Sequence, residues 1–269
     1  MKFACAAMLA ASLSLPAFAE TPTPRNPLND GETWADLRGD IVGDETIADG
    51  TALFEVDAPY RAHDAATVPI HIRQLDDSAA IESAVIVIDE NPAPLAAELS
   101  FGPSMAPLDM EVRVRVNMYS NVRVIARTDA GLAMNGRFVK ASGGCSAPAT
   151  KDPELALASM GQMRLKYFED APLMSPVRRE AQIMIRHPNY SGLQRDQVTQ
   201  LFIAAHFIDT LEVFQGDDML FTMEGGISIS ENPVFRFSYA DNGTPALRIR
   251  ATDTEGNVFE QTLIKSGHT

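Results

Sequence analysis

Short runs of alternating apolar and polar residues recur along most of the chain, and they limit the folds that it can adopt. The runs 67–72 and 110–118 alternate with period two, and the run 84–88 is wholly apolar. Proline, glycine, asparagine and aspartate separate successive runs at intervals of roughly 10–15 residues. This spacing is typical of antiparallel sheets with one buried and one solvated face. The pattern therefore predicts an all-β chain rather than alternating strands and helices.

The predicted strands form two series. The first comprises 53–56, 67–72, 84–88, 110–118, 121–128 and 137–140, and the second comprises 180–185, 201–205, 210–214, 219–223, 234–239, 246–251 and 258–263. Between them, Asp152 is a candidate N-cap and Pro153 suits the first helical position, which predicts an amphipathic helix over 152–168. We therefore expect two β-sandwich domains joined by a short helix and linker. A short helix and turn are also expected within 34–49.

The N-terminus has the pattern of a secretory signal peptide. Lys2 precedes an apolar segment of about a dozen residues, which ends in an Ala-x-Ala cleavage pattern at Ala19. Residues 1–19 are the predicted signal, and residues 20–33, rich in proline, are expected to form a flexible leader. Cleavage would remove Lys2 and Cys5, so the formal charge would change from −14 to −15 and Cys145 would be the sole cysteine. The expected location is the periplasm.

Composition excludes several classes of function. A formal charge of −14 and a pI near 4.7 argue against binding to nucleic acid, because a phosphate backbone requires a basic surface. The mean hydropathy of −0.07, and the absence of a run of ~18 apolar residues after the N-terminus, argue against membrane insertion. Two cysteines cannot build a disulfide-rich scaffold.

The segment around Cys145 is the strongest candidate for chemistry. The cysteine follows Gly143 and Gly144 and precedes Ser146, so small residues flank it directly after the last strand of the first series. Because glycine gives wide backbone freedom, we expect Gly143, Gly144 and Ser146 to form a flexible arm that exposes the thiol. An unpaired cysteine in an oxidising compartment is unusual, and the alternative is a loop cysteine without a function.

No residue pattern indicates a catalytic centre, a metal site or a cofactor. A nucleophilic cysteine needs a nearby base, and the histidines at 63, 71, 187, 206 and 268 are all distant from Cys145 in sequence. We expect His187 to be structural and His206 to be a hydrogen-bonded core histidine on an apolar strand. No spacing of cysteine and histidine suits zinc. In the run 110–118, Arg113 and Arg115 are expected to face solvent, while the valines between them face the core.

Several motifs together resemble a fusion of the two subunits of the sulfur-oxidation carrier SoxYZ. The SoxY-like half would span about 34–145; it contains DETIADG, VPIHI, the NPAPLAAELSF and NVRVIARTDAG runs, and the terminal Gly-Gly-Cys. The SoxZ-like half would span about 175–267 and contains IRHPNYSGLQRD and the ISISENPVFRFSY run. The nearest subgroup by this resemblance is the fused SoxYZ-like carriers associated with quinoprotein dehydrogenases.

The resemblance implies two immunoglobulin-like β-sandwiches, a SoxY-like one over 34–140 and a SoxZ-like one over 177–269, with the arm and helical linker at 141–176. It implies a non-catalytic periplasmic carrier that holds a sulfur-containing intermediate covalently on Cys145 and presents it to redox enzymes, either Sox-type or of a quinoprotein dehydrogenase system. The two halves would pair with each other. Ser146 and Ala147 replace the trailing glycines of the family pattern, and the arm is internal, so it should sweep less volume than a free tail.

Two other functions fit the sequence. The chain could be a docking or accessory module of a periplasmic dehydrogenase system in which Cys145 is incidental. It could also be a redox sensor or a dimer linked through Cys145. The identity of the cargo, the loading enzyme and the oligomeric state do not follow from the sequence.

Overall fold

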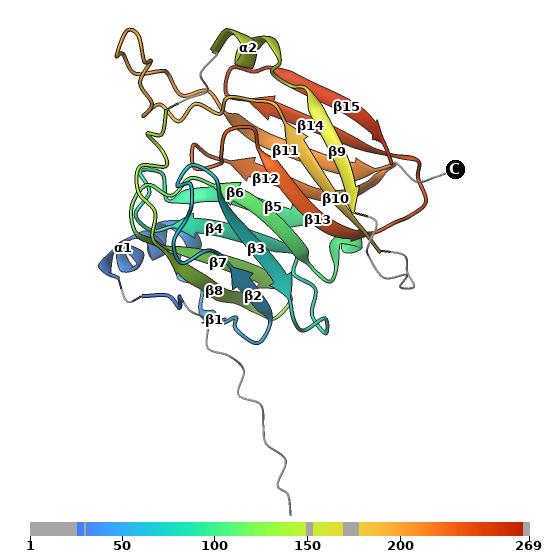
Figure 1. Ribbon diagram of the computed structural model, residues 1–269. Helices are drawn as coiled ribbons and strands as arrows, with labels where there is room; N and C mark the ends of the chain where they lie inside the picture. Colours follow the sequence, from blue (N-terminus) through green and yellow to red (C-terminus); the bar gives the residue numbers. More distant parts are fainter. Residues whose placement is uncertain (1–25, 30, 149–152, 169–177, 266–269) are drawn as a thin grey trace, which may run out of the picture.

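The computed structural model describes residues 26–29, 31–148, 153–168 and 178–265, so the predicted signal peptide lies outside it. In these ranges the chain is nearly all-β and contains two sheets (Figure 1). The helical elements are α1 (Glu32–Val42), the 3-10 turn η1 (Pro103–Met105) and α2 (Pro153–Ala158). The strands of the first half are β1 (Ile47–Asp49), β2 (Phe54–Asp57), β3 (Val68–Gln74), β4 (Ser83–Ile88), β5 (Leu95–Phe101), β6 (Asp109–Val114), β7 (Ser120–Thr128) and β8 (Gly131–Val139). The strands of the second half are β9 (Met163–Phe168), β10 (Arg178–Ile185), β11 (Ile208–Gln215), β12 (Asp218–Gly225), β13 (Val234–Ala240), β14 (Ala246–Asp253) and β15 (Val258–Ile264).

Each of the two sheets contains strands from both halves of the chain. The nine-stranded sheet has the order β1-β8-β7-β4-β5-β12-β11-β14-β15, and the six-stranded sheet has the order β2-β3-β6-β13-β10-β9. The joints are antiparallel: β5 pairs with β12 from Ala97 to Phe101, and β6 pairs with β13 from Met110 to Val112. Each joint covers a strand edge that would otherwise be exposed. The predicted sandwiches are therefore confirmed, and they form one continuous double layer.

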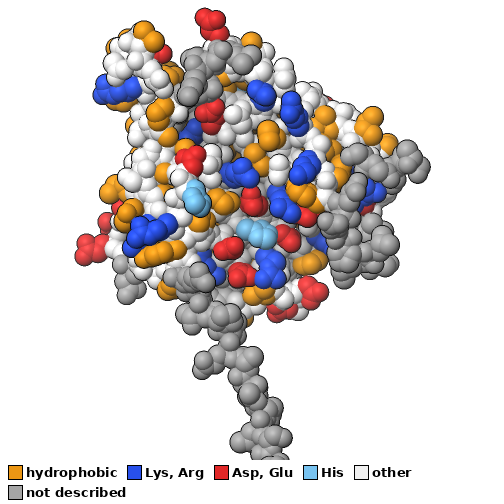
Figure 2. All heavy atoms as spheres, viewed as in Figure 1, with side chains coloured by type: hydrophobic (Ala, Val, Ile, Leu, Met, Phe, Trp, Pro, Cys, Tyr) orange, Lys and Arg blue, Asp and Glu red, His pale blue; other side chains and the backbone are white. Residues whose placement is uncertain are grey.

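The core lies between the two sheets and extends across the joints. Strands of both halves bury alternate apolar residues there, as β3 does with Val68, Ile70 and Ile72 and β14 does with Leu247 and Ile249. Helix α1 covers the outer face of the nine-stranded sheet over a smaller apolar cluster. The outer face of the six-stranded sheet carries interspersed basic and acidic side chains (Figure 2). Burial of alternate residues is what the period-two runs predict.

Two local predictions, a helix over 152–168 and a strand at 201–205, are wrong. The helix expected over 152–168 ends at Ala158, and 163–168 is strand β9, because MRLKYF alternates and pairs with β10. Asp152, the predicted N-cap, lies outside the described residues. The strand expected at 201–205 is irregular loop. The described part of the leader is bound to the body, where the buried Asn26 donates side-chain hydrogen bonds of 3.0 Å to Ala58 O and Phe138 O.

Candidate functional site

Cys145 lies in a turn, residues 143–147, that packs at the junction of the two halves; we call it the cysteine turn. The Gly143 amide donates to Asn117 O (2.8 Å) and the Gly144 amide donates to Val116 O (3.2 Å). The Ser146 amide then donates to Gly143 O (3.2 Å), which closes the turn around Cys145. Cys145 is the free cysteine of the described residues, and its exposed fraction is 0%.

The prediction of an exposed thiol on a flexible arm is therefore wrong for this conformation, and the two glycines explain why. A Cβ on Gly144 would lie 2.1 Å from Ala65 O and 2.7 Å from Val116 O, so only glycine allows the backbones to approach this closely. Gly143 has a φ of +77°, which glycine adopts without the strain of other residues. In this turn glycine allows tight packing and so permits burial of the neighbouring cysteine.

A loop of the second half, residues 187–206, holds the outer side of the cysteine turn; we call it the clasp loop. The Ser191 hydroxyl donates a 2.5 Å hydrogen bond to Cys145 O, and the Gln194 amide donates a 3.0 Å bond to Ala147 O. Ser191 and Gln194 are both buried. Both contacts are to the backbone of the turn, so they hold its conformation without contacting the thiol.

Arg115 is the positive charge that acts on the pKa of the thiol. Burial raises the pKa of the Cys145 thiol, and the guanidinium of Arg115 acts in the opposite direction. Burial also lowers the pKa of Arg115, against the influence of Cys145, Glu231 and Asp64. The net effect is a neutral, weakly nucleophilic thiol at neutral pH, because the thiolate is the reactive form.

The prediction that Arg115 faces solvent, which follows from period-two alternation in 110–118, is wrong. Strand β6 ends at Val114, and Arg115 is 1% exposed; the inward positions of the valines are confirmed. The Arg115 amide donates to Ser228 O (2.7 Å), and the buried side chain of Asn91 donates to Arg115 O (2.8 Å) and to Ser228 Oγ (2.9 Å). Contacts to the other half thus redirect this residue, and no local sequence signal reports them.

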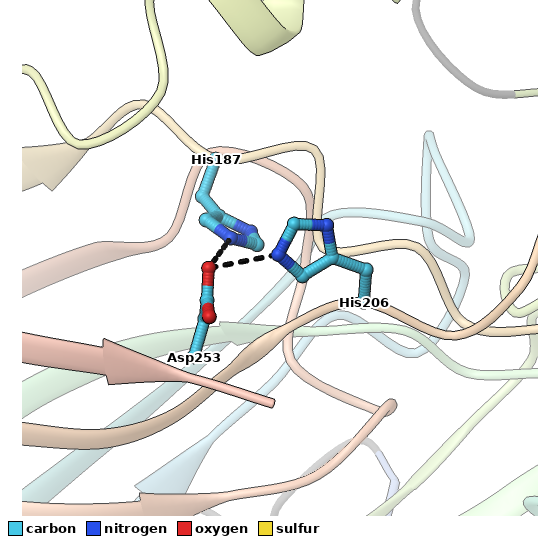
Figure 3. A group of neighbouring side chains, drawn as sticks. All are labelled: His187, His206 and Asp253. Carbon is cyan, nitrogen blue, oxygen red and sulfur yellow. Dashed lines mark hydrogen bonds and ion pairs between the residues drawn. The ribbon is translucent and has the colours of Figure 1, made fainter. Parts of the chain in front are cut away.

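A second buried polar cluster consists of His187, His206 and Asp253 (Figure 3). Asp253 Oδ2 lies 3.3 Å from His187 Nε2 and 2.8 Å from His206 Nε2, and it accepts a bond from Asn257. Burial alone would raise the pKa of Asp253, but the bonds from Asn257, His206 and His187 lower it to about 2. The two histidines stand at the two ends of the clasp loop, so Asp253 ties those ends together.

The atoms of this trio are close enough to hold a metal ion, since one ligand atom of each lies within 4.8 Å of the others. The hydrogen bonds instead fit a neutral imidazole. The Asn189 amide donates 3.0 Å to His187 Nδ1, so the proton of that ring is on Nε2, where it is donated to Asp253. A nitrogen that binds a metal ion must be unprotonated, whereas the nitrogen of His187 that faces Asp253 carries the proton of the ring. The predicted structural roles of His187 and His206 are confirmed by these contacts, although His206 lies on a loop rather than a strand.

The remaining histidines do not join the cysteine. His63 is exposed, His71 forms a 2.7 Å ion pair with Asp109 on the six-stranded sheet, and His268 lies outside the described residues. Within the ranges that the structure describes, no histidine is hydrogen-bonded to the Cys145 thiol.

The matches to protein-family models divide the chain into the same two halves as the fold. Residues 38–145 match the family model of the sulfur oxidation protein SoxY, and residues 176–263 match that of the sulphur oxidation protein SoxZ. Cys145 is the last residue of the first match. The two matches in one chain support a fused SoxYZ-like protein with a role in sulfur oxidation. No curated protein matches the chain.

Solved structures resemble parts of the chain. The sulfur carrier protein SoxY from Chlorobium limicola f thiosulfatophilum is 25% identical over 40% of this chain and 94% of its own, with a TM-score of 0.34. A superoxide reductase (neelaredoxin) from Ignicoccus hospitalis is 13% identical over 39% of this chain and 90% of its own, with a TM-score of 0.29. Because both TM-scores are below 0.5, neither likeness identifies a function.

Proposed function

We propose that this fused SoxYZ-like chain is a carrier that holds a sulfur-containing intermediate covalently on Cys145 and presents it to separate enzymes. The carrier has no catalytic site of its own. The observation that carries the proposal is the position of Cys145. Cys145 is the last residue of the match to the SoxY model, lies outside regular strand pairing, and is part of a turn where the two halves meet.

The buried thiol fits a carrier that alternates between a sheltered and an open state. In the sheltered state the thiol is neutral and inaccessible, which protects it from oxidation and from unwanted exchange. Two backbone bonds to 116–117 and two side-chain bonds from the clasp loop hold the turn. At roughly 1 kcal/mol each, these bonds permit transient opening without unfolding of the sheets. Loading and unloading would occur in the open state.

We further propose a periplasmic location and redox-enzyme partners. The location rests on the signal-peptide pattern of residues 1–19, and an unpaired cysteine that is sheltered suits an oxidising compartment. The partners would be Sox-type enzymes or a quinoprotein dehydrogenase system. Among the described residues, no helix is long and apolar enough to cross a membrane.

The intact mass of protein isolated from its own cells tests the proposal. We expect adducts on Cys145 that a thiol reductant removes and that the Cys145→Ser variant lacks. The mass of the polypeptide also reports whether the mature chain begins at Glu20. Purified protein without adducts, unreactive toward tetrathionate, together with normal growth of the Cys145→Ser strain on a reduced sulfur compound, would refute it.

The same variant separates the other two functions. A docking module in which Cys145 is incidental would keep its partners in a pull-down after Cys145→Ser. A dimer linked through sulfur would migrate at twice the monomer mass in non-reducing electrophoresis and as a monomer after reduction. The carrier is expected to show neither behaviour, but rather a monomeric band whose mass changes with its sulfur load.

A further inference from the structure

We propose that a pocket between helix α1, strand β8 and the leader binds a small organic anion with an apolar body. The acidic group of this ligand would contact Arg38 and Arg137, and its apolar body would pack against Trp34. The site is separate from Cys145 and goes beyond the proposed carrier function. Three features carry the inference: the size of the cavity, two guanidinium groups without anions, and an apolar wall.

The pocket forms where strand β1 ends while its neighbour β8 continues, at the end of the molecule that carries α1 (Figure 1). Strand β1 pairs with β8 only from Leu132 to Met134. The next residues of β8, 135–137, line a cavity of about 660 Å³, together with Pro27 and Leu28 of the leader and Trp34 of α1. This volume suits a small molecule, because ligand pockets commonly measure about 300–1,000 Å³.

Arg137 lines this pocket with a buried guanidinium that has no anion. The residue is 8% exposed, and its Nη1 donates to two neutral acceptors, Asn135 Oδ1 (3.3 Å) and Gly136 O (2.8 Å). In the described ranges Arg137 forms no ion pair, whereas the equally buried Arg123 lies 2.8 Å from a carboxylate oxygen of Asp89. A buried cation normally has such a partner, because an unpaired one is strongly disfavoured.

Arg38 adds a second positive charge to the wall. Its Nη1 donates to Gly43 O (3.3 Å) and its Nη2 to Glu45 O (2.5 Å), which are both backbone carbonyls. Among the described residues it also forms no ion pair. The carboxylate on the same wall, Asp49, already accepts the Thr51 amide (2.9 Å) with Oδ1. Two guanidinium groups thus share the pocket with one carboxylate, and this excess of positive charge favours an anion.

The rest of the wall is apolar, and this specifies the class of ligand. Leu28, Trp34, Ile47 and Met134 all line the cavity and are all half-buried. A guanidinium binds carboxylate or sulfonate groups through its planar fork of N–H donors. A bare inorganic anion would leave the apolar side chains in contact with water. The arrangement therefore suits an aromatic or branched aliphatic carboxylate or sulfonate.

Two probes with the same ring skeleton provide the test. Anilinonaphthalene sulfonate is an aromatic anion, and phenylnaphthylamine is the same molecule without the sulfonate group. Trp34 is the only tryptophan of the chain, so quenching of its fluorescence reports each titration of the full chain. The dissociation constants of the two probes are then compared in the wild type and in the variants.

We expect Arg137→Met to weaken binding of the sulfonate at least about tenfold and that of phenylnaphthylamine less than about twofold, because only the sulfonate loses a charged partner. Arg38→Met should act in the same direction, and it replaces Arg137→Met if circular dichroism shows that the latter does not fold. Arg113→Met is the matched control. It removes one positive charge from the six-stranded sheet and should leave both constants unchanged.

Three results would overturn the inference. They are the absence of quenching by the sulfonate, equal losses for the two probes, and a loss in Arg113→Met as large as that in the pocket variants. Cys145→Ser should bind both probes as the wild type does, and a weaker affinity would contradict a site separate from the thiol. The carrier proposal stands or falls independently, because it depends on adducts formed on Cys145 in cells.

Discussion

The cysteine turn and the trio of His187, His206 and Asp253 are both buried polar sites, and the clasp loop connects them. Asp253 accepts bonds from both imidazoles and from Asn257, and its second oxygen accepts the amides of Glu255 and Asn257. By contrast, Arg115, whose charge acts on the Cys145 thiol, keeps a buried Nε without a hydrogen-bond partner.

The two sites therefore differ in how completely their buried polar groups are paired. A buried network whose donors and acceptors are all paired stabilises the conformation around it. A buried donor without a partner destabilises the resting state, which is acceptable where a ligand supplies the missing acceptor. The trio therefore fixes the base of the clasp loop, whereas the guanidinium of Arg115 keeps one buried donor without an acceptor.

The largest expected effect is that of Asp253→Ala. Removal of the carboxylate leaves two buried imidazoles and several amides without their acceptor, so the free energy of unfolding should fall by about 3–5 kcal/mol. Urea denaturation measures it. Cys145→Ser should change the same quantity by about 1 kcal/mol or less, because the thiol contributes little to the network. Equal losses in the two variants would contradict the distinction.

Acid should weaken the trio by a smaller amount. Hydrogen bonds lower the pKa of Asp253 from 3.8 to about 2 in the folded protein, so the carboxylate contributes stability above pH 4 that is lost as the pH falls through about 2. The loss should be about 2 kcal/mol, since one pKa unit corresponds to 1.36 kcal/mol. Urea denaturation from pH 5 to pH 2 should show this loss in the wild type and not in Asp253→Asn. If the free energy of unfolding changed with pH in the same way in the wild type and in Asp253→Asn, the lowered pKa of Asp253 would be contradicted.

The smallest expected effect concerns the two glycines of the cysteine turn. Gly144→Ala places a Cβ 2.1 Å from Ala65 O, so the turn should no longer pack against residues 65 and 116. The rate of thiol labelling should then rise at least about tenfold, which corresponds to 1.4 kcal/mol. Gly143→Asn is the matched change, because asparagine tolerates a positive φ and the position is open. Its labelling rate should stay near that of the wild type. A similar increase in the labelling rate of both variants would mean that the turn does not depend on close packing at Gly144.

Local patterns predicted the sheets well and the site only in part. Alternation and turn residues locate most of the strands, because one buried face leaves a period-two signature. Strand β9 was missed because its segment also fits a helix, and β1 and β5 were not predicted either. Cys145 and its glycines were identified, but their burial was not, because it depends on Ala65, Val116 and the clasp loop. Arg115 and Asp253 have no local signal at all; their roles arise from residues more than 40 positions away, such as Ile229 and His206.

The N-terminal side of the cysteine turn is connected to the end of strand β8 at Val139, which is fixed in the nine-stranded sheet. Only six residues lead from Val139 to Cys145, and a fully extended chain of that length reaches roughly 20 Å. Under the proposed carrier function, an enzyme that unloads Cys145 must therefore bring its reacting atoms near the junction of the two halves. Wide or shallow catalytic openings are compatible with that approach, whereas a long narrow tunnel built for a free tail is not.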